Sequence, residues 1–250
     1  MIQGLTEFLP VSSSGHLSLY QYFTGNSGEA SFYLAMVLHL GTLLAIFIAF
    51  RKTVWEIITF KDKKFIGMLL ISLLVLIPFY IFKDFVEKIS TDDDILTEGF
   101  CFLYTATILF LADKWSRGEK KKEDIKVKDA IVVGFFQGIA LMPGISRSGS
   151  CICGGLFSGF DRKLAVEYSF ILGIPTILGG CLVELKDAPS GTGIEIMPFI
   201  VGFFVALIVG LLAIKMVEWL IKTDKFKWFA YYTGLLGIVV VTIGIVNKFN

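Results

Sequence analysis

The amino-acid sequence predicts an all-α integral membrane protein with six transmembrane helices and two re-entrant helix hairpins in an inverted-topology repeat. Hydrophobic residues make up 55% of the 250 residues, and the mean hydropathy is +0.74. Several apolar runs approach the roughly 20 residues that cross a bilayer. A polar motif also occurs twice, so we expect a single membrane domain, 1–250, with pseudo-repeats at about 1–113 and 130–247.

The first hairpin, at about residues 1–24, concentrates polar side chains in an apolar chain. Gln3 and Glu7 are four apart and share a helix face, and Pro10 ends that helix because it lacks an N–H group. Turn-forming and N-capping residues follow, namely Ser12, Ser13, Ser14 and Gly15. Hydroxyls and free N–H groups therefore gather at a helix N-terminus, which is an anion-binding arrangement.

Three apolar spans follow, separated by loops of alternating charge. The spans are Phe32–Phe50, Phe65–Phe82 and Ile95–Ala112. Basic residues follow the first and third spans, including Arg51, Lys52, Lys61, Lys63, Lys64, Lys114, Arg117, Lys120, Lys121, Lys122, Lys126 and Lys128. Acidic residues follow the second, including Asp84, Glu87, Asp92, Asp93 and Asp94. The positive-inside rule places the basic loops in the cytoplasm.

The second hairpin, residues 130–160, is apolar but is broken by Pro143, Gly144 and a Ser-Arg-Ser-Gly cluster. Irregular backbone is tolerated at membrane depth only where protein or a water-filled cavity surrounds it, so we expect a re-entrant pair of half-helices facing a pocket. Three more spans follow, Leu164–Val183, Ile196–Met216 and Trp228–Val246. If both hairpins re-enter from opposite faces, the loop charges alternate without exception.

The two motifs align without a gap and differ in a useful way. The matched pairs are Gln3 with Gln137, Gly4 with Gly138, Ser12 with Ser146, Ser14 with Ser148, and Gly15 with Gly149. Glu7 and His16 occur only in the first copy, and Arg147 occurs only in the second, opposite Ser13. We therefore expect both loops to face one ligand in a composite site.

Each ionisable group in these motifs has a functional and a structural interpretation. Arg147 offers a planar, permanently charged fork that suits phosphate oxygens. His16 suits proton transfer near neutral pH, and Glu7 suits acid–base work, although Glu7 could instead form a structural ion pair with Arg147. The serines could serve only as caps and loop solvation. His39, which lies within a span without an obvious partner, is interpreted as structural.

The two motifs, Gln3 to His16 and Pro143 to Gly149, resemble the signature of the bacitracin-resistance type undecaprenyl-diphosphate phosphatases. The resemblance implies hydrolysis of a C55 isoprenoid diphosphate to the monophosphate carrier and inorganic phosphate, for cell-wall synthesis. It also implies a multi-pass protein of the bacterial plasma membrane whose active site opens to the outer face. By position it makes Glu7, Ser13, His16 and Arg147 catalytic. The expected substrate contacts are Gln3, Ser12, Ser14, Gln137, Ser146 and Ser148.

This chain departs from the family's pattern at three places. Gln3 stands where many members have a second glutamate, and Cys151 stands where threonine is common. The usual N-terminal lead-in is also mostly absent, and no cleavable signal peptide is expected because the polar motif begins at Gln3. The cysteines, Cys101, Cys151, Cys153 and Cys181, lie in apolar surroundings without metal-ligand spacing, so we expect them to pack.

The expected reaction needs a charge clamp, an in-line nucleophile and a proton for the leaving oxygen. Arg147 and the serine loops would hold the diphosphate, Ser13 or water would attack, and His16 and Glu7 would move protons. The residues do not separate serine, histidine and water as the attacking group. A divalent cation, Mg²⁺ or Ca²⁺, is expected at Glu7. The alternative function is a polyprenyl-phosphate transporter or flippase, because transporters share this architecture.

The expected partners are an isoprenoid diphosphate lipid, the membrane and a second copy in a homodimer. A net charge of +1 gives no case for nucleic acid. If the site is composite, Arg147 should lie within about 10 Å of Ser13 and His16, a span that one phosphate and its hydrogen bonds can bridge. An apolar groove should then lead from the site toward the lipid.

Overall fold

A computed structural model gives the fold and describes residues 1–25, 29–81, 95–115, 118–186, 196–223 and 225–249. In this part of the chain the regular elements are helices, and the one strand-like pairing is an isolated bridge between Lys120 and Phe160. The all-α prediction is therefore confirmed. The elements in chain order are α1 (Ile2–Thr6), α2 (Ser13–Thr24), α3 (Glu29–Ala49), α4 (Arg51–Ile58), α5 (Lys63–Leu74), α6 (Leu76–Ile81), α8 (Leu96–Trp115), the 3₁₀ turn η1 (Lys122–Asp124), α9 (Val127–Ile139), α10 (Arg147–Phe157), α11 (Arg162–Lys186), α12 (Ile196–Lys222) and α13 (Lys227–Phe249).

Several helices are long and apolar enough to cross a membrane. Five qualify directly within the described residues, namely Lys63–Ile81, Leu96–Trp115, Arg162–Leu182, Ile196–Lys222 and Lys227–Phe249. The pair Tyr33–Ala49 and Arg51–Ile58 qualifies as a sixth if it is taken as one span, although it bends by 89°. The protein is thus a multi-pass membrane protein, and the six predicted spans correspond to these six segments.

Two pairs of short helices occupy the positions of the predicted hairpins. α1 and α2 have 5 and 12 residues, and α9 and α10 have 13 and 11, so each is shorter than a spanning helix. α9 ends at Ile139 and α10 begins at Arg147, and the break between them contains Pro143, as predicted. The inverted relation of the two halves stays a prediction.

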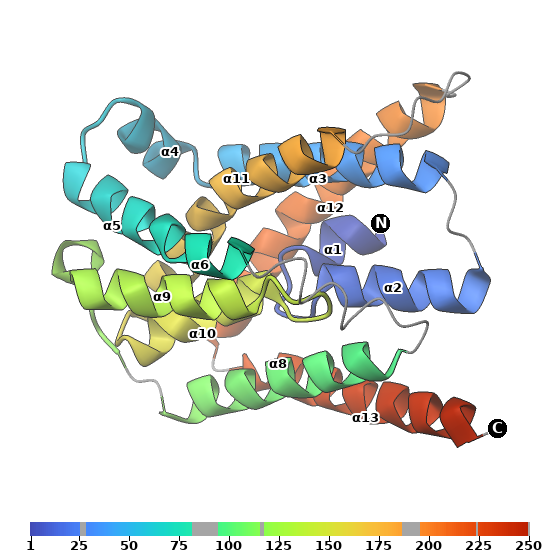
Figure 1. The fold of residues 1–250 in the computed structure, drawn as a ribbon. Coiled ribbons are helices and arrows are strands. Elements are labelled where there is room, and N and C mark those ends of the chain that lie inside the picture. Colours follow the sequence, from blue (N-terminus) through green and yellow to red (C-terminus); the bar gives the residue numbers. More distant parts are fainter. Residues whose placement is uncertain (26–28, 82–94, 116–117, 187–195, 224, 250) are drawn as a thin grey trace.

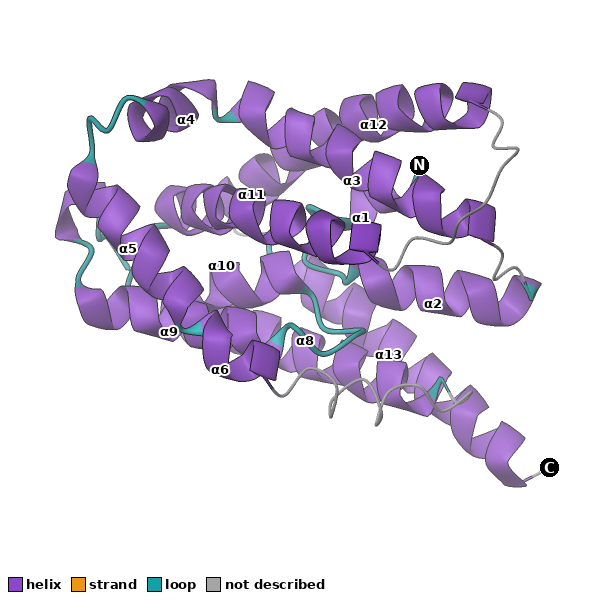
Figure 2. Ribbon diagram, turned by 45° about the horizontal axis from the view of Figure 1, so that its top comes forward, coloured by secondary structure: helices purple, strands orange, loops and turns teal. Residues whose placement is uncertain are grey.

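The long helices pack around the ends of these short ones (Figure 1). α3 packs along α12, and α8 packs along α13, whereas α10 lies against α8, α9 and α11. Small residues allow close approach between membrane helices, because packing rather than the hydrophobic effect drives their association. A Cβ at Gly41 of α3, for example, would lie 2.6 Å from the Phe203 carbonyl oxygen of α12. The view turned by 45° shows the motif loops between α1, α2 and α10, inside the bundle (Figure 2).

The basic loops predicted to share the cytoplasmic side do lie together. Lys122 Nζ, which follows α8, is 2.9 Å from Glu56 Oε2 and 3.1 Å from Asp62 Oδ2, between α4 and α5. Burial alone would lower the pKa of Lys122, but the hydrogen bonds and charges of both carboxylates outweigh it and raise that pKa. The acidic residues 84–94 lie outside the described residues, so the opposite side of the predicted charge pattern is not tested.

Candidate active site

The first motif folds so that one carboxylate collects several donors. α1 ends at Thr6, and the backbone N–H of its C-cap, Glu7, donates to the Gln3 carbonyl at 3.0 Å. Gln3 Nε2 also donates to Glu7 Oε2 at 3.0 Å, which confirms that the two side chains share a face. Ser12 caps α2 by accepting from the Gly15 N–H at 3.2 Å, and Ser13 Oγ donates to Glu7 Oε2 at 2.8 Å.

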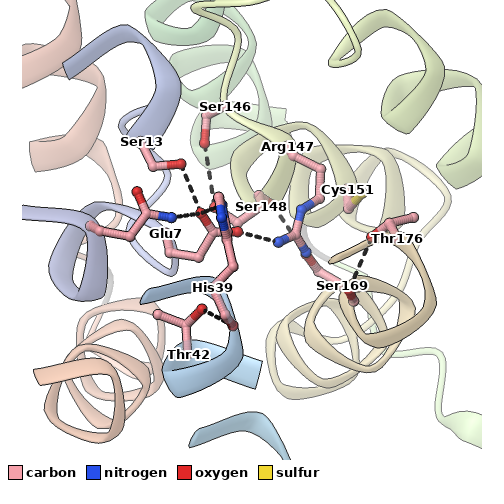
Figure 3. A network of polar contacts seen from close by, with 12 residues as sticks. Glu7, Ser13, His39, Thr42, Ser146, Arg147, Ser148, Cys151, Ser169 and Thr176 are labelled. Atoms are coloured by element: carbon pink, nitrogen blue, oxygen red, sulfur yellow. Dashed lines mark hydrogen bonds and ion pairs between the residues drawn. The ribbon is translucent and has the colours of Figure 1, made fainter. Parts of the chain in front are cut away.

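The second motif brings a fixed cation to the same carboxylate. Ser146 caps α10 by accepting from the Gly149 N–H at 3.1 Å, so Arg147 begins the helix. Arg147 Nη2 donates to Glu7 Oε1 at 2.6 Å. Figure 3 shows Ser13 and Arg147 converging on Glu7 from different elements. The two motif loops therefore meet at Glu7, as a composite site requires, and the ion pair that the sequence left open as an alternative is present.

These groups line a cavity of about 220 Å³. Its lining residues are Glu7, Ser13, His39, Leu141, Arg147, Thr176, Ile177, Gly180 and Cys181. α11 supplies one wall, and it approaches the guanidinium so closely that a Cβ at Gly173 would lie 2.2 Å from Arg147 Nη1. Glu7 itself is only 8% exposed. The cavity thus combines a partly buried ion pair and a hydroxyl with apolar walls, as small-molecule sites do.

Comparison with known proteins decides the family. The profile described as "Bacitracin resistance protein BacA" matches residues 1–239. This chain belongs to the BacA family. It is 40% identical over 257 residues to the undecaprenyl-diphosphatase of Carboxydothermus hydrogenoformans, covering 100% of this chain and 96% of that protein. It is 42% identical over 252 residues to the undecaprenyl-diphosphatase of Halothermothrix orenii, covering 97% and 95%.

In this BacA-family protein the histidine that lines the cavity is His39, which the sequence interpretation had treated as structural. Its Nε2 lies 3.9 Å from Glu7 Oε2, and α3 holds it in the cavity wall. Its Nδ1 is buried and has no hydrogen-bond partner among the described residues. The signal that could have found it is general, because ionisable side chains within spans are costly and are usually functional.

His16 lies elsewhere, and this corrects its predicted position in the pocket. Its Nδ1 is 2.7 Å from the Ser12 carbonyl oxygen, and its Nε2 is 2.7 Å from the Tyr232 hydroxyl of α13. The ring stacks on Tyr232 and meets Phe102 edge-on, with centroids 5.8 and 5.4 Å away. These contacts satisfy both ring nitrogens, and His16 is not among the residues that line the cavity.

The four remaining serines of the two motifs form hydrogen bonds within their own loop or between the two loops. Ser14 Oγ accepts from the Gly144 N–H, and Ser148 Oγ donates to the Leu9 carbonyl, both at 3.2 Å. These two bonds join the first loop to the second. Ser12 and Ser146 act as helix caps, as described above. The geometry therefore favours the structural interpretation of these four serines, which do not line the cavity.

Two glutamines were also predicted to contact substrate. Gln3 is 2% exposed, donates a hydrogen bond to Glu7 and does not line the cavity. Gln137 is 1% exposed and accepts a hydrogen bond from Cys151 Sγ at 3.2 Å. Cys151 is buried in the helix packing, as are Cys101 and Cys153, which agrees with the prediction, whereas Cys181 is half-buried and lines the cavity.

An apolar groove of about 390 Å³ lies next to the cavity along α11. Ile174 and Pro175 line the groove, whereas the next two residues, Thr176 and Ile177, line the cavity. The other walls come from α3, α4 and α5, and all lining side chains are apolar. The 89° bend between α3 and α4 turns α4 toward α5, so the bend helps to form the groove. An apolar groove beside the site was predicted from the sequence.

Proposed function

We propose that this BacA-family protein hydrolyses undecaprenyl diphosphate to undecaprenyl phosphate and inorganic phosphate in the bacterial plasma membrane. The observation that carries the proposal is a buried carboxylate, Glu7, that accepts hydrogen bonds from both the Ser13 hydroxyl and the Arg147 guanidinium. The names of the relatives support the same substrate and reaction. The groove beside the cavity suits an isoprenoid chain.

Arg147 acts as the phosphate clamp. A guanidinium has five N–H donors in a planar fork, so it can hold Glu7 through Nη2 and still donate to phosphate oxygens in the cavity. Arg147 is also the first residue of α10, an 11-residue helix whose N-terminal N–H groups favour an anion. The clamp neutralises charge that develops on the diphosphate as the bond breaks.

Ser13 attacks the terminal phosphorus, with Glu7 as its base. The hydroxyl already donates to Glu7 Oε2 at 2.8 Å, which is the contact a serine needs to lose its proton as it attacks. The new bond joins Ser13 Oγ to phosphorus, and the broken bond joins that phosphorus to the bridging oxygen. The lipid monophosphate leaves with this electron pair. Glu7 gives the serine's proton up to the leaving phosphate oxygen and is again a carboxylate. Water then attacks the phosphoserine and the bond from phosphorus to Ser13 Oγ breaks. Glu7 takes the water's proton and returns it to Oγ as inorganic phosphate leaves.

His39 is the second group that can handle protons in this cavity. The sequence assigned that role to His16, whose ring nitrogens are bonded to Ser12 and Tyr232 instead. His39 faces the cavity beside Glu7 and can exchange a proton with the leaving phosphate oxygen or with Glu7. Proton transfer is therefore assigned to Glu7 and His39.

We propose a divalent cation, Mg²⁺ or Ca²⁺, in the cavity, where the protein offers few side chains that could bind it. The described residues contain no cluster of three or more His, Cys, Asp or Glu side chains that could hold a metal. Glu7 supplies a carboxylate in the cavity, and Mg²⁺ is commonly held by one or two carboxylates together with substrate phosphates. Glu7 would hold the cation with the substrate's own oxygens, and the cation would neutralise phosphate charge.

The site is proposed to open to the outer face, because the charge pattern of the sequence predicts the acidic loops on that side. A homodimer also stays a prediction. The transporter alternative is not favoured, since moving a lipid headgroup does not require a hydroxyl bonded to a buried carboxylate.

Phosphate release by the purified protein tests the proposal. Undecaprenyl diphosphate in detergent should yield inorganic phosphate, and Ser13→Ala should lower the rate by at least about 10²-fold. Ser158→Ala is the matched control, because that hydroxyl bonds the Gly154 carbonyl at the far end of α10. If the wild-type protein moves the lipid between leaflets without releasing phosphate, the proposed function is wrong.

A further inference from the structure

A chain of contacts links α13 to the motif loop through His16. The Tyr232 hydroxyl lies 2.7 Å from His16 Nε2, and His16 Nδ1 lies 2.7 Å from the Ser12 carbonyl oxygen. The Tyr232 and His16 rings are also nearly parallel, at 9°. Tyr232 lies 216 positions from His16 in sequence, and neither the motif nor its resemblance assigns it a role.

The carbonyl at the end of this chain belongs to a residue in a costly conformation. Ser12 has φ 70, and it is one of two non-glycine residues with positive φ among those described. Such conformations persist only where the surroundings over-determine them. Here the His16 ring and the His16 backbone N–H, at 3.3 Å, both contact the Ser12 carbonyl, while the Ser12 side chain caps α2.

The Ser12 conformation controls where the next side chain points. Ser13 follows directly, and its hydroxyl lies 2.8 Å from Glu7 Oε2 in the cavity. A reacting group displaced by about 1 Å can lose about 10²-fold in rate, since catalysis depends on alignment. Whatever holds the Ser12 carbonyl therefore also holds the Ser13 hydroxyl in reach of Glu7.

The two contacts also determine the tautomer of the neutral imidazole. A carbonyl oxygen only accepts, so Nδ1 must carry a hydrogen, and in the neutral ring Nε2 then accepts from the Tyr232 hydroxyl. Both ring nitrogens of the neutral tautomer are thereby used. The ring keeps no nitrogen for a substrate phosphate, which agrees with its absence from the cavity lining.

We propose that Tyr232 is a positioning residue, which acts through His16 to hold the Ser12–Ser13 turn in the conformation that presents the Ser13 hydroxyl to Glu7. The proposal rests on the proposed phosphatase function. It gives the motif histidine a structural task in catalysis, and it predicts that a neutral side chain with a donor at the same place can replace it.

Two variants test the proposal, and both are compared with wild type by inorganic phosphate release from undecaprenyl diphosphate. Tyr232→Phe removes the hydroxyl and keeps the ring, so kcat should fall about tenfold with KM changed less than about twofold. Tyr231→Phe is the matched control, because it is the neighbouring tyrosine and is 52% exposed, and it should behave as wild type. His16→Asn keeps an N–H donor where Nδ1 stands, and it should retain at least about ten times the kcat of His16→Ala.

A second readout does not depend on turnover. Amide hydrogen exchange at residues 13–16 should become faster in Tyr232→Phe than in Tyr231→Phe, because the turn loses its anchor. Unchanged exchange together with wild-type kcat in Tyr232→Phe would overturn the proposal. So would a His16→Asn variant as slow as His16→Ala, with an ionisation lost from its pH profile, since His16 would then act chemically. If the wild-type protein releases no phosphate, the proposed function fails, while the exchange measurement still tests the anchor.

Discussion

At the scale of single residues, Glu7 organises the site. Its carboxylate accepts from Gln3, Ser13 and Arg147, which come from α1, α2 and α10. The burial of such a pair is tolerable because each charge satisfies the other, and removal of one partner commonly costs about 3–5 kcal/mol. In the proposed mechanism, the same contacts that hold the loops together also place the nucleophile and the phosphate clamp.

Arg147→Lys keeps the charge but not the fork. A single ammonium cannot bond Glu7 and a phosphate with the same geometry, so we expect kcat to fall by about 10²-fold with the protein still folded. Arg162→Lys is the matched control, because Arg162 lies at the start of α11 and donates a hydrogen bond to the Ile221 carbonyl of α12. Phosphate release and thermal unfolding are measured for both. A normal rate in Arg147→Lys would mean that charge neutralisation alone suffices.

His39→Gln tests which histidine moves protons. Removing a general acid or base typically costs about 10²–10⁴-fold, so we expect a loss of at least about 10²-fold in kcat. The pH profile of kcat should lose one ionisation in His39→Gln. The comparison variant is His16→Gln, whose profile should keep its shape because that ring has no place in the cavity. A wild-type profile in His39→Gln would exclude His39 from proton transfer.

Glu7→Gln tests the cation. If Glu7 holds Mg²⁺ or Ca²⁺ with the substrate, the variant should need a higher cation concentration for half-maximal rate, by about tenfold or more, and kcat should fall. Titration of the metal in a chelator-buffered assay measures this. An unchanged cation requirement would mean that the metal is held by the diphosphate without Glu7.

The sequence predicts part of this site well, for a physical reason. Glu7, Ser13 and Arg147 belong to two aligned copies of one motif, and a buried charge of each sign demands a partner. The position of His39 within a span was a general signal for a functional residue, but the contact that holds His16 could not be predicted, because it depends on Tyr232, which lies far away in the sequence. Local pattern assigns a histidine to a helix start, whereas tertiary packing decides which way its ring faces.

At the scale of elements, the broken hairpins were predictable and the bend in α3 was not. Pro143 interrupts the second hairpin, and prolines end helices for a known steric reason. The break after Ala49 contains neither proline nor glycine, since Phe50 connects α3 to α4. The bend therefore depends on how α4 packs in the fold and not on a helix-breaking residue.

The groove that this bend helps to form should contribute to chain-length preference. Leu70→Trp adds bulk to a groove-lining side chain on α5, so KM for undecaprenyl diphosphate should rise about tenfold, which is about 1.4 kcal/mol. Hydrolysis of farnesyl diphosphate, with its short chain, should change less than about twofold. Leu74→Trp is the control, because Leu74 is on the same helix, is 60% exposed and does not line the groove. Equal effects on both substrates would argue against a chain-binding groove.

At the scale of the whole molecule, two hairpins far apart in the sequence complete one cavity. Gly144 bonds Ser14, Ser148 bonds Leu9, and Arg147 bonds Glu7, so each motif is incomplete without the other. The meeting of the loops followed from the sequence, because irregular backbone and charge at membrane depth must face protein or water. The inverted relation of the halves and the outer-face opening stay predictions, because the acidic loops that support them lie outside the described residues.

A double-variant kinetic cycle tests the central claim that the two motifs form one catalytic unit. Inorganic phosphate release from undecaprenyl diphosphate is measured for wild type, Ser13→Ala, Arg147→Ala and the double variant, each checked for folding by thermal unfolding. Residues that act as a unit are strongly non-additive, so the double variant should be about as slow as the slower single variant. Losses that multiply in full would show that Ser13 and Arg147 serve separate events, and this result would contradict the composite site.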